Sequence, residues 1–415
     1  MLTCFEGTGE SIVCAMKRAL LLLLCCAALF ACSKRAQFER AAKEGNTQAQ
    51  FYLGLMYANG DGVPKDEARA AEWYRMAAER GYAKAQANLG DMYAKGRGIP
   101  KDDTRAFEWT QKAAGQGEPV AQFNLGVMFA DGKGVARDEA RALTWYEKAA
   151  DQGDAKAQFN LGVLYANRKT PNDDTDAFRW FQKAADLGVA KAQVRLGNMY
   201  ADGKGVRKDE AKAVEWYQRA ANHGDADAQF NLGVMYATGR GVPKDEAKAA
   251  EWYQQAAGQG DALAQSNLGV MYANGTGVGK DESKAAEWYQ RAAEQGNALA
   301  QSNLGGMYAY GMGVARNESK AVEWYRKAAE QGEVSAQFNL GMMYSEGIGV
   351  SKDQVQAYAW INLAAASNVP IARETRDKLD QQLSPEQKTA GERLSKELWE
   401  TIRNRARQGP LVQRF

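Results

Sequence analysis

The chain has 415 residues, of which 45% are hydrophobic, and its 53 Lys and Arg nearly balance its 51 Asp and Glu, for a net charge of +2. This balance argues against a nucleic-acid-binding protein, because such proteins usually carry a large excess of positive charge. The hydrophobic fraction is ordinary for a folded protein. All five cysteines lie within the first 32 residues, so the rest of the chain has neither disulfides nor a thiolate metal site.

Near the start of the chain, residues 16–32 read MKRALLLLLCCAALFAC and have the layout of an export signal. The positively charged Lys17 and Arg18 precede a 12-residue apolar run, Ala19–Phe30. This run is shorter than the about 20 residues that cross a bilayer. We therefore assign residues 1–31 to a signal segment, with Met16 as the true start.

The end of this segment resembles the cleavage site of a bacterial lipoprotein, Leu29-Phe30-Ala31-Cys32. Cys32 would then carry the lipid anchor, and Ser33 after it resembles a signal for outer-membrane sorting. We expect an exported, periplasmic, lipid-anchored protein of the outer membrane of a Gram-negative bacterium. Plain secretion and a cytoplasmic location are the alternatives.

After residues 32–44, assigned to the anchor or linker and the start of the first helix, one short sequence recurs every 36 residues, and once after 35. An Ala-Gln pair marks each copy, and nine of the 10 tryptophans occupy a second fixed position. Such a period indicates a solenoid of stacked units. We assign residues 45–368 to nine repeats, whose Ala-Gln pairs begin at Ala49, Ala85, Ala121, Ala157, Ala192, Ala228, Ala264, Ala300 and Ala336.

The sequence of each repeat predicts two helices, as the sixth repeat illustrates. Asp225 is suited to cap the first helix, in which Leu232 and Tyr236 lie on one apolar face. The second helix begins near Asp245 and ends at Gly260. Alternating β-branched runs are absent from the array. The predicted fold class is therefore all-α, a right-handed α-solenoid of nine helix-turn-helix repeats with a C-terminal capping helix.

Glycines recur at fixed places in every repeat. Gly233 lies inside the first helix, where glycine costs about 1 kcal/mol relative to alanine, and we expect it to allow close approach beneath a tryptophan of the neighbouring repeat. The segment GRGVPK that follows has the composition of a phosphate loop, but such a loop follows a strand. Its glycines are expected to end one helix and permit the turn. The fourth repeat lacks them over Asn167–Asp174, where we expect an irregular turn.

Residues 369–415 are assigned to capping helices and a flexible tail. Ser384-Pro385-Glu386-Gln387 has the pattern of a capping box with proline at the first helical position. One apolar stripe follows, made of Ala390, Leu394, Leu398 and Ile402, with Trp399 alongside. We expect this helix to seal the end of the solenoid. A partner-binding or membrane-surface helix is the alternative, because several arginines lie near its end.

The repeated pattern A-x-x-x-L-G-x-M-Y-x-x-G-x-G-V-x-x-D-x-x-x-A-x-x-W resembles the Sel-one-like repeat, a relative of the tetratricopeptide repeat. The resemblance covers residues 45–368 and implies an exported scaffold that holds other proteins together. Some cysteine-rich members of the family carry a disulfide in each repeat and are linked to β-lactam binding. This array has no cysteine, which argues against that branch.

Residues typical of catalysis are sparse. The single histidine, His223, occupies a position that other repeats fill with Gln, and we expect it to be solvated. The Ser-x-x-Lys motif of penicillin-recognising enzymes does not occur. The carboxylates Asp245, Glu246 and Glu251 recur with the period, which indicates capping and solvation. We expect no catalytic residue, cofactor, metal or small-molecule substrate.

Positions that vary between repeats are candidates for partner binding. Two such positions lie four residues apart on the first helix, so they share a face. Related arrays place this face inside a groove, and an extended or helical partner segment would fit there. The alternative is that the phenylalanines pack between neighbouring repeats. The candidate surface consists of Phe51, Leu55, Phe123, Val127, Phe159, Val163, Phe230, Val234, Phe338 and Met342, with a weaker patch at Ser302, Gly306, Tyr310 and Met312.

From these features we predict a non-catalytic scaffold or adaptor of the bacterial envelope. Its expected partners are other proteins, and the membrane through Cys32, but not nucleic acid. An envelope enzyme acting on peptidoglycan or β-lactams is one alternative function. A secreted effector that binds a host receptor is another.

Overall fold

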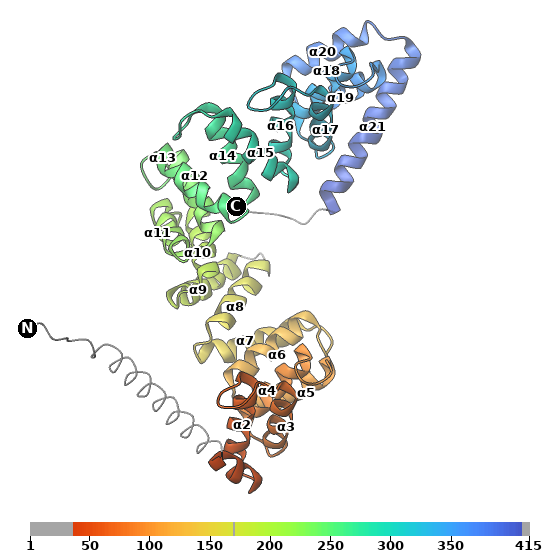
Figure 1. Cartoon of the computed structure of the whole chain (residues 1–415). Helices are drawn as coiled ribbons and strands as arrows, with labels where there is room; N and C mark the ends of the chain where they lie inside the picture. The colour runs from red at the N-terminus through yellow and green to blue at the C-terminus, as the bar shows by residue number, and fades with distance from the viewer. Residues whose placement is uncertain (1–35, 169–170, 409–415) are drawn as a thin grey trace, which may run out of the picture. The chain divides into compact units, whose positions relative to one another are not determined.

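The computed structural model describes residues 36–168 and 171–408, in which helices and short turns occur and no strand is found. These residues divide into two compact units, the first ending at Leu187 and the second beginning at Gly188. Within each unit, consecutive helices run antiparallel and stack side by side (Figure 1). The expected signal segment, Cys32 and the tail after residue 408 lie outside the described residues.

The first unit contains four repeats of two helices each, preceded by a helical segment at residues 36–43. Its first helices are α2 (Thr47–Asn59), α4 (Ala83–Lys95), α6 (Pro119–Asp131) and α8 (Ala155–Arg168). Its second helices are α3 (Glu67–Glu79), α5 (Asp103–Gly115), α7 (Glu139–Asp151) and α9 (Pro171–Asp186).

The second unit contains five repeats and two C-terminal helices. Its first helices are α10 (Ala190–Asp202), α12 (Ala226–Thr238), α14 (Ala262–Asn274), α16 (Ala298–Tyr310) and α18 (Val334–Glu346). Its second helices are α11 (Glu210–Asn222), α13 (Glu246–Gly258), α15 (Glu282–Glu294), α17 (Glu318–Ala329) and α19 (Gln354–Ala366). The chain ends with α20 (Pro370–Asp380) and α21 (Pro385–Gln408). The all-α solenoid is confirmed, while its right-handed sense stays a prediction.

The helix ends form where the sequence predicts them. The Asp225 carboxylate accepts a hydrogen bond from the Ala228 N–H at 3.0 Å and caps α12. Asp245 caps α13 in the same way. Gly239 closes α12 in the left-handed conformation, with φ of 71°. These local contacts satisfy backbone groups that a helix end leaves without partners.

The glycine inside each first helix has a different neighbour from the one we expected. A Cβ on Gly233 would lie 2.5 Å from the ring of Tyr253 in the second helix of the same repeat. The expectation of a neighbouring repeat's tryptophan is therefore wrong. The tyrosine fills the seam within its own hairpin, and the missing side chain lets α12 and α13 approach. The loop glycine Gly241 also does more than turn the chain, since a Cβ there would collide with the Glu210 carbonyl of the preceding repeat.

A chain of glutamine side chains connects successive repeats. Gln122 in α6 donates to the Ala114 carbonyl at the end of the preceding repeat, and its own oxygen accepts from Gln152 at 2.8 Å. The buried side-chain amide of Gln122 is thereby paired, as burial requires. In the fourth repeat the donor position is occupied by Leu187, and the buried Gln158 Oε1 accepts no hydrogen bond from any described residue.

The fourth repeat differs from the others in its second helix. Helix α9 begins at Pro171 and has 16 residues, whereas the second helices of the other repeats have 12 or 13. The expected irregular turn falls partly on residues 169–170, outside the described residues. The longer helix takes up part of the segment that forms a glycine loop in the other repeats.

The C-terminal helix packs against the last repeat. Ser384 and Gln387 form the expected capping box, with the Ser384 N–H donating to Gln387 Oε1 at 3.0 Å and the Gln387 N–H donating to Ser384 Oγ at 3.3 Å. Leu398 and Ile402 pack against the core formed by α17, α18 and α19. Arg405 pairs with Glu330 at 3.0 Å. Helix α21 therefore covers the end of the array, as predicted.

Candidate protein-binding groove

The predicted binding residues lie on one face of each first helix, which we call the first-helix face. In the first unit this face consists of Phe51, Leu55, Phe123, Val127, Phe159 and Val163, together with Ala87 and Asp91 at the equivalent positions of the second repeat. In the second unit it consists of Phe230, Val234, Phe338 and Met342, together with the residues at the equivalent positions of the other three repeats. Successive first helices contact one another in the second unit, α14 with α16 and α16 with α18. The faces of α14, α16 and α18 are therefore adjacent to one another.

Four of the five phenylalanines stack on an aromatic ring of their own hairpin. The centroids of Phe123 and Tyr146 are 5.8 Å apart, as are those of Phe230 and Tyr253, and both ring pairs are tilted. Such pairs stabilise the hairpin beyond the burial of area alone. One side of these rings therefore packs into the core, as the alternative interpretation expects.

The other side of most of these rings is open. Phe123, Phe159, Phe230 and Phe338 are half-buried, and Phe51 is 8% exposed. Fully buried rings could not contact a partner, whereas these partly exposed rings can. The first-helix face as a binding surface stays a prediction.

A row of asparagines on the same face was missed by the sequence reasoning. Asn88, Asn124, Asn160, Asn231, Asn267, Asn303 and Asn339 follow the variable aromatic position and are half-buried. Burial raises the pKa of Tyr253 to about 12, and a hydrogen bond from the Asn267 side chain opposes this shift. The same pairing joins Tyr146 to Asn160 and Tyr289 to Asn303. The signal was the Asn of the motif A-Q-x-N-L-G, which recurs in seven of the nine repeats and which a search for varying positions passes over.

The first unit contains a hollow of about 810 Å³ on this face. Its walls come from α2, α4, α6 and α8 and bring together the predicted Phe51, Leu55 and Phe123 with Asn88 and Asn124. Val127, Phe159 and Val163 are not among its lining residues. Charged side chains surround the apolar centre: Lys84, Asp91, Lys95, Glu118, Asp154 and Lys156. A polar rim around an apolar centre is the usual form of a recognition surface.

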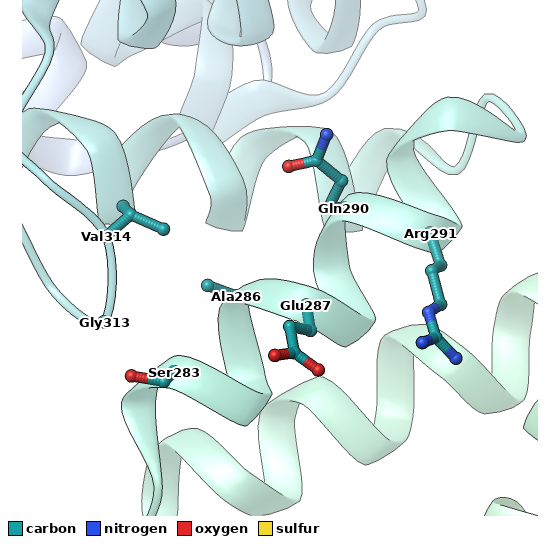
Figure 2. Close-up of a pocket in the computed structure, with 7 residues that line it drawn as sticks. All are labelled: Ser283, Ala286, Glu287, Gln290, Arg291, Gly313 and Val314. Atoms are coloured by element: carbon teal, nitrogen blue, oxygen red, sulfur yellow. The ribbon is translucent and has the colours of Figure 1, made fainter.

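A second hollow, of about 320 Å³, lies in the second unit against α15. Figure 2 shows Ala286, Glu287, Gln290 and Arg291 along this helix, with Gly313 and Val314 on the adjoining loop. Residues of the same kind recur at the equivalent positions of other repeats. The hollow is thus a feature of the seam between repeats.

Three further features were predicted or searched for among the described residues: the single histidine, metal-ligand clusters and membrane-spanning helices. His223 is exposed at the end of α11. Among the described residues there is no group of three His, Cys, Asp or Glu that could hold a metal ion. Within residues 36–168 and 171–408, none of the helices has the length and apolar character needed to span a bilayer.

Comparison with known proteins identifies the family. The Sel1 repeat matches residues 47–82, 83–118, 119–154, 155–189, 190–225, 226–261, 262–297, 298–333 and 334–369. A Sel1 repeat protein from Oxalobacter formigenes is 38% identical, with 75% of this chain and 91% of that chain covered and a TM-score of 0.60. No curated protein matched the chain.

A second solved structure is similar over nearly the whole length. It is a protective antigen of uropathogenic Escherichia coli that displays an SLR fold, 35% identical over 90% of both chains, with a TM-score of 0.51. The chain therefore belongs to the Sel1 repeat family. This fold is a scaffold type for protein–protein interaction and is generally non-enzymatic, and repeats of this kind generally bind other proteins.

Proposed function

We propose that this protein is a non-catalytic scaffold or adaptor that binds segments of partner proteins along its first-helix face. The observation that carries the proposal is the exposure of half-buried rings beside a row of side-chain amides, with the hollow of the first unit among them. Rings supply apolar contact area, and amides can pair with the backbone of a bound chain.

Site-specific photo-cross-linking tests this proposal. A benzophenone amino acid placed at Phe123 or Phe230 reports on the first-helix face, and the same probe at Trp109 or Trp252 on the second helices serves as a matched aromatic control. We expect discrete cross-linked partners in intact cells from the first pair and not from the second. Cross-links from the tryptophan positions alone would place the binding surface on the second helices and contradict the proposal.

We further propose that the protein is exported and held at the outer membrane by a lipid on Cys32. The residues Leu29–Cys32 and the apolar run before them support this location. The description of the Escherichia coli relative as a protective antigen is compatible with exposure outside the cytoplasm.

Metabolic labelling with an alkynyl fatty acid in a Gram-negative host tests the anchor. We expect label in the membrane fraction for the unaltered chain and for Cys26→Ser, and its loss in Cys32→Ser. A soluble, unlabelled periplasmic product from the unaltered chain would support plain secretion. Label that persists in Cys32→Ser would show that another residue carries the lipid.

A further inference from the structure

The first repeat is more apolar than the others at two positions. Tyr52 in α2 lies where seven repeats have Asn and the fifth has Arg195, and Met76 in α3 lies where the next seven repeats have Lys, Arg or Gln. The two side chains are 40% and 47% exposed. The end repeats of a solenoid usually turn a polar face to the solvent. The first repeat departs from this rule, which indicates that its end contacts something other than water.

The last repeat shows how an apolar side chain at the Met76 position is covered. Leu363 occupies this position in α19 and is only 7% exposed. It belongs to the core cluster against which Leu398 and Ile402 of α21 pack. The described residues leave nearly half of Met76 open by comparison.

The exposed residues belong to one connected apolar group, the N-terminal patch, which consists of Phe38, Tyr52, Trp73 and Met76. The ring centroids of Phe38, in the helical segment at residues 36–43, and of Tyr52 are 5.5 Å apart. Phe38 and Trp73 pack against the same small buried cluster. Met76 follows Trp73 by three residues and is its neighbour on α3. The patch therefore includes residues of all three helices at the start of the array.

The composition of the patch suits a membrane interface. Trp and Tyr combine an apolar ring with a polar group and are enriched where a bilayer meets water. Within residues 36–45, Arg40 and Lys43 balance Glu39 and Glu44. The expected contact is therefore apolar rather than electrostatic.

The length of the chain before the patch favours the membrane as its partner. Cys32, the proposed lipid site, precedes Ala36 at the start of the helical segment by four residues. An extended chain spans at most about 3.3–3.6 Å per residue, so Ala36 lies within about 15 Å of Cys32. The patch begins two residues later, at Phe38. A lipid on Cys32 would hold the patch beside the bilayer in every molecule, whereas contact with a second copy depends on concentration.

We propose that the N-terminal patch rests in the headgroup region of the membrane that holds the lipid of Cys32. The side chains of Tyr52 and Met76 enter this region, so the first repeat makes a second contact with the bilayer. This inference rests on the proposed lipid anchor. It does not depend on partner binding along the first-helix face.

Quenching by brominated lipids tests the contact on the lipidated full chain in vesicles of phosphatidylethanolamine and phosphatidylglycerol. Removal of the signal segment leaves Cys32 as the only cysteine, so a thiol introduced by Met76→Cys or Tyr52→Cys can be labelled selectively with an NBD fluorophore. Lys148→Cys and Asn124→Cys place the same probe at the equivalent positions of the third repeat. Interfacial side chains reach about 5–10 Å into the boundary between headgroups and acyl chains. We therefore expect brominated lipid to quench the probes at positions 52 and 76 and to leave those at 124 and 148 unchanged.

The outcomes separate the contact from the anchor, which flotation of the vesicles reports independently. A chain that floats with the vesicles but shows no quenching at positions 52 and 76 would overturn the inference and leave the anchor standing. Equal quenching at all four positions would also overturn it, because the contact would not be confined to the first repeat. A blue shift of the probes that appears only at high surface density, without quenching, would assign the patch to a second copy. A chain that does not float would overturn both the anchor and the inference.

Discussion

Gly233 in α12 lies directly against the ring of Tyr253 in α13, so closely that a Cβ would be 2.5 Å from Tyr253 Cδ1. The same relationship recurs at Gly54 with Tyr74, Gly126 with Tyr146 and Gly269 with Tyr289. Each hairpin therefore closes over a ring that fits only because the facing helix has no side chain there. This contact fixes the spacing between the two helices and, through it, the position of the first-helix face.

The change Gly233→Ala tests this relationship. Alanine gains about 1 kcal/mol in helix propensity, but overpacking a filled seam costs about 1–3 kcal/mol, so we expect a net loss of stability. Gly258→Ala in α13 is the control, because nothing lies within 4 Å of a Cβ at that exposed position. Urea unfolding should show Gly258→Ala to be neutral or stabilising. Equal stabilisation by both changes would refute the assigned role of the glycine.

The glutamine chain predicts a stabilising substitution. Leu187→Gln places an amide where Gln152 stands in the third repeat, and it would donate to the buried Gln158 Oε1. We expect a gain of about 1 kcal/mol, the usual net value of one hydrogen bond. The reciprocal change Gln152→Leu leaves the Gln122 oxygen without its donor and should destabilise by about 1–3 kcal/mol. Thermal unfolding of both variants measures the effect, and a destabilised Leu187→Gln would contradict it.

Acid should weaken the second helices through their capping aspartates. Backbone hydrogen bonds from Lys248 and Lys284 lower the pKa of Asp245 and Asp281 below the ordinary value of 3.8. A carboxyl with a lowered folded-state pKa stabilises the fold above its unfolded pKa, and this contribution is lost as the pH falls through the folded value. Asn317 caps α17 without a titrating group. Hydrogen exchange below pH 4 should therefore show α13 and α15 fraying before α17, whereas simultaneous fraying of all three would argue against the caps.

Leu398 and Trp399 distinguish the two interpretations of α21, as a helix that seals the solenoid or as a helix that binds a partner or a membrane surface. Leu398 packs into the core of the last repeat, while Trp399 is 48% exposed and stacks only with Arg403, at 4.9 Å. Leu398→Ala should destabilise the last repeat by about 2–3 kcal/mol, the lower part of the range for a truncated core residue. Trp399→Ala should change stability little. If Trp399→Ala instead removes a partner or membrane binding, the helix also serves as an interaction surface.

The fold was predictable because its signals are local and repeated. Caps such as Asp225, stop residues such as Gly239 and the 36-residue period all act within a few residues of the sequence. The partner of Gly233 was not predictable from spacing, since the register between two helices of a hairpin depends on how their side chains interlock. The Trp and the Tyr are adjacent in the sequence, and only packing decides which one faces the glycine.

The candidate site was predicted only in part, for a similar reason. The aromatic positions were found because they vary, whereas the asparagines beside them recur in seven of the nine repeats and do not stand out as variable positions. The hollow is lined by residues of four first helices, α2, α4, α6 and α8, which come together only when the repeats stack.

The central claim is that partners bind on the first-helix face. Methyl chemical-shift mapping with a partner captured by cross-linking tests it most directly. Binding should shift the methyl signals of Leu55, Val127 and Val163 on that face and leave Leu143 on the second helix α7 unchanged. Shifts confined to Leu143 and its neighbours on the second helices would contradict the account.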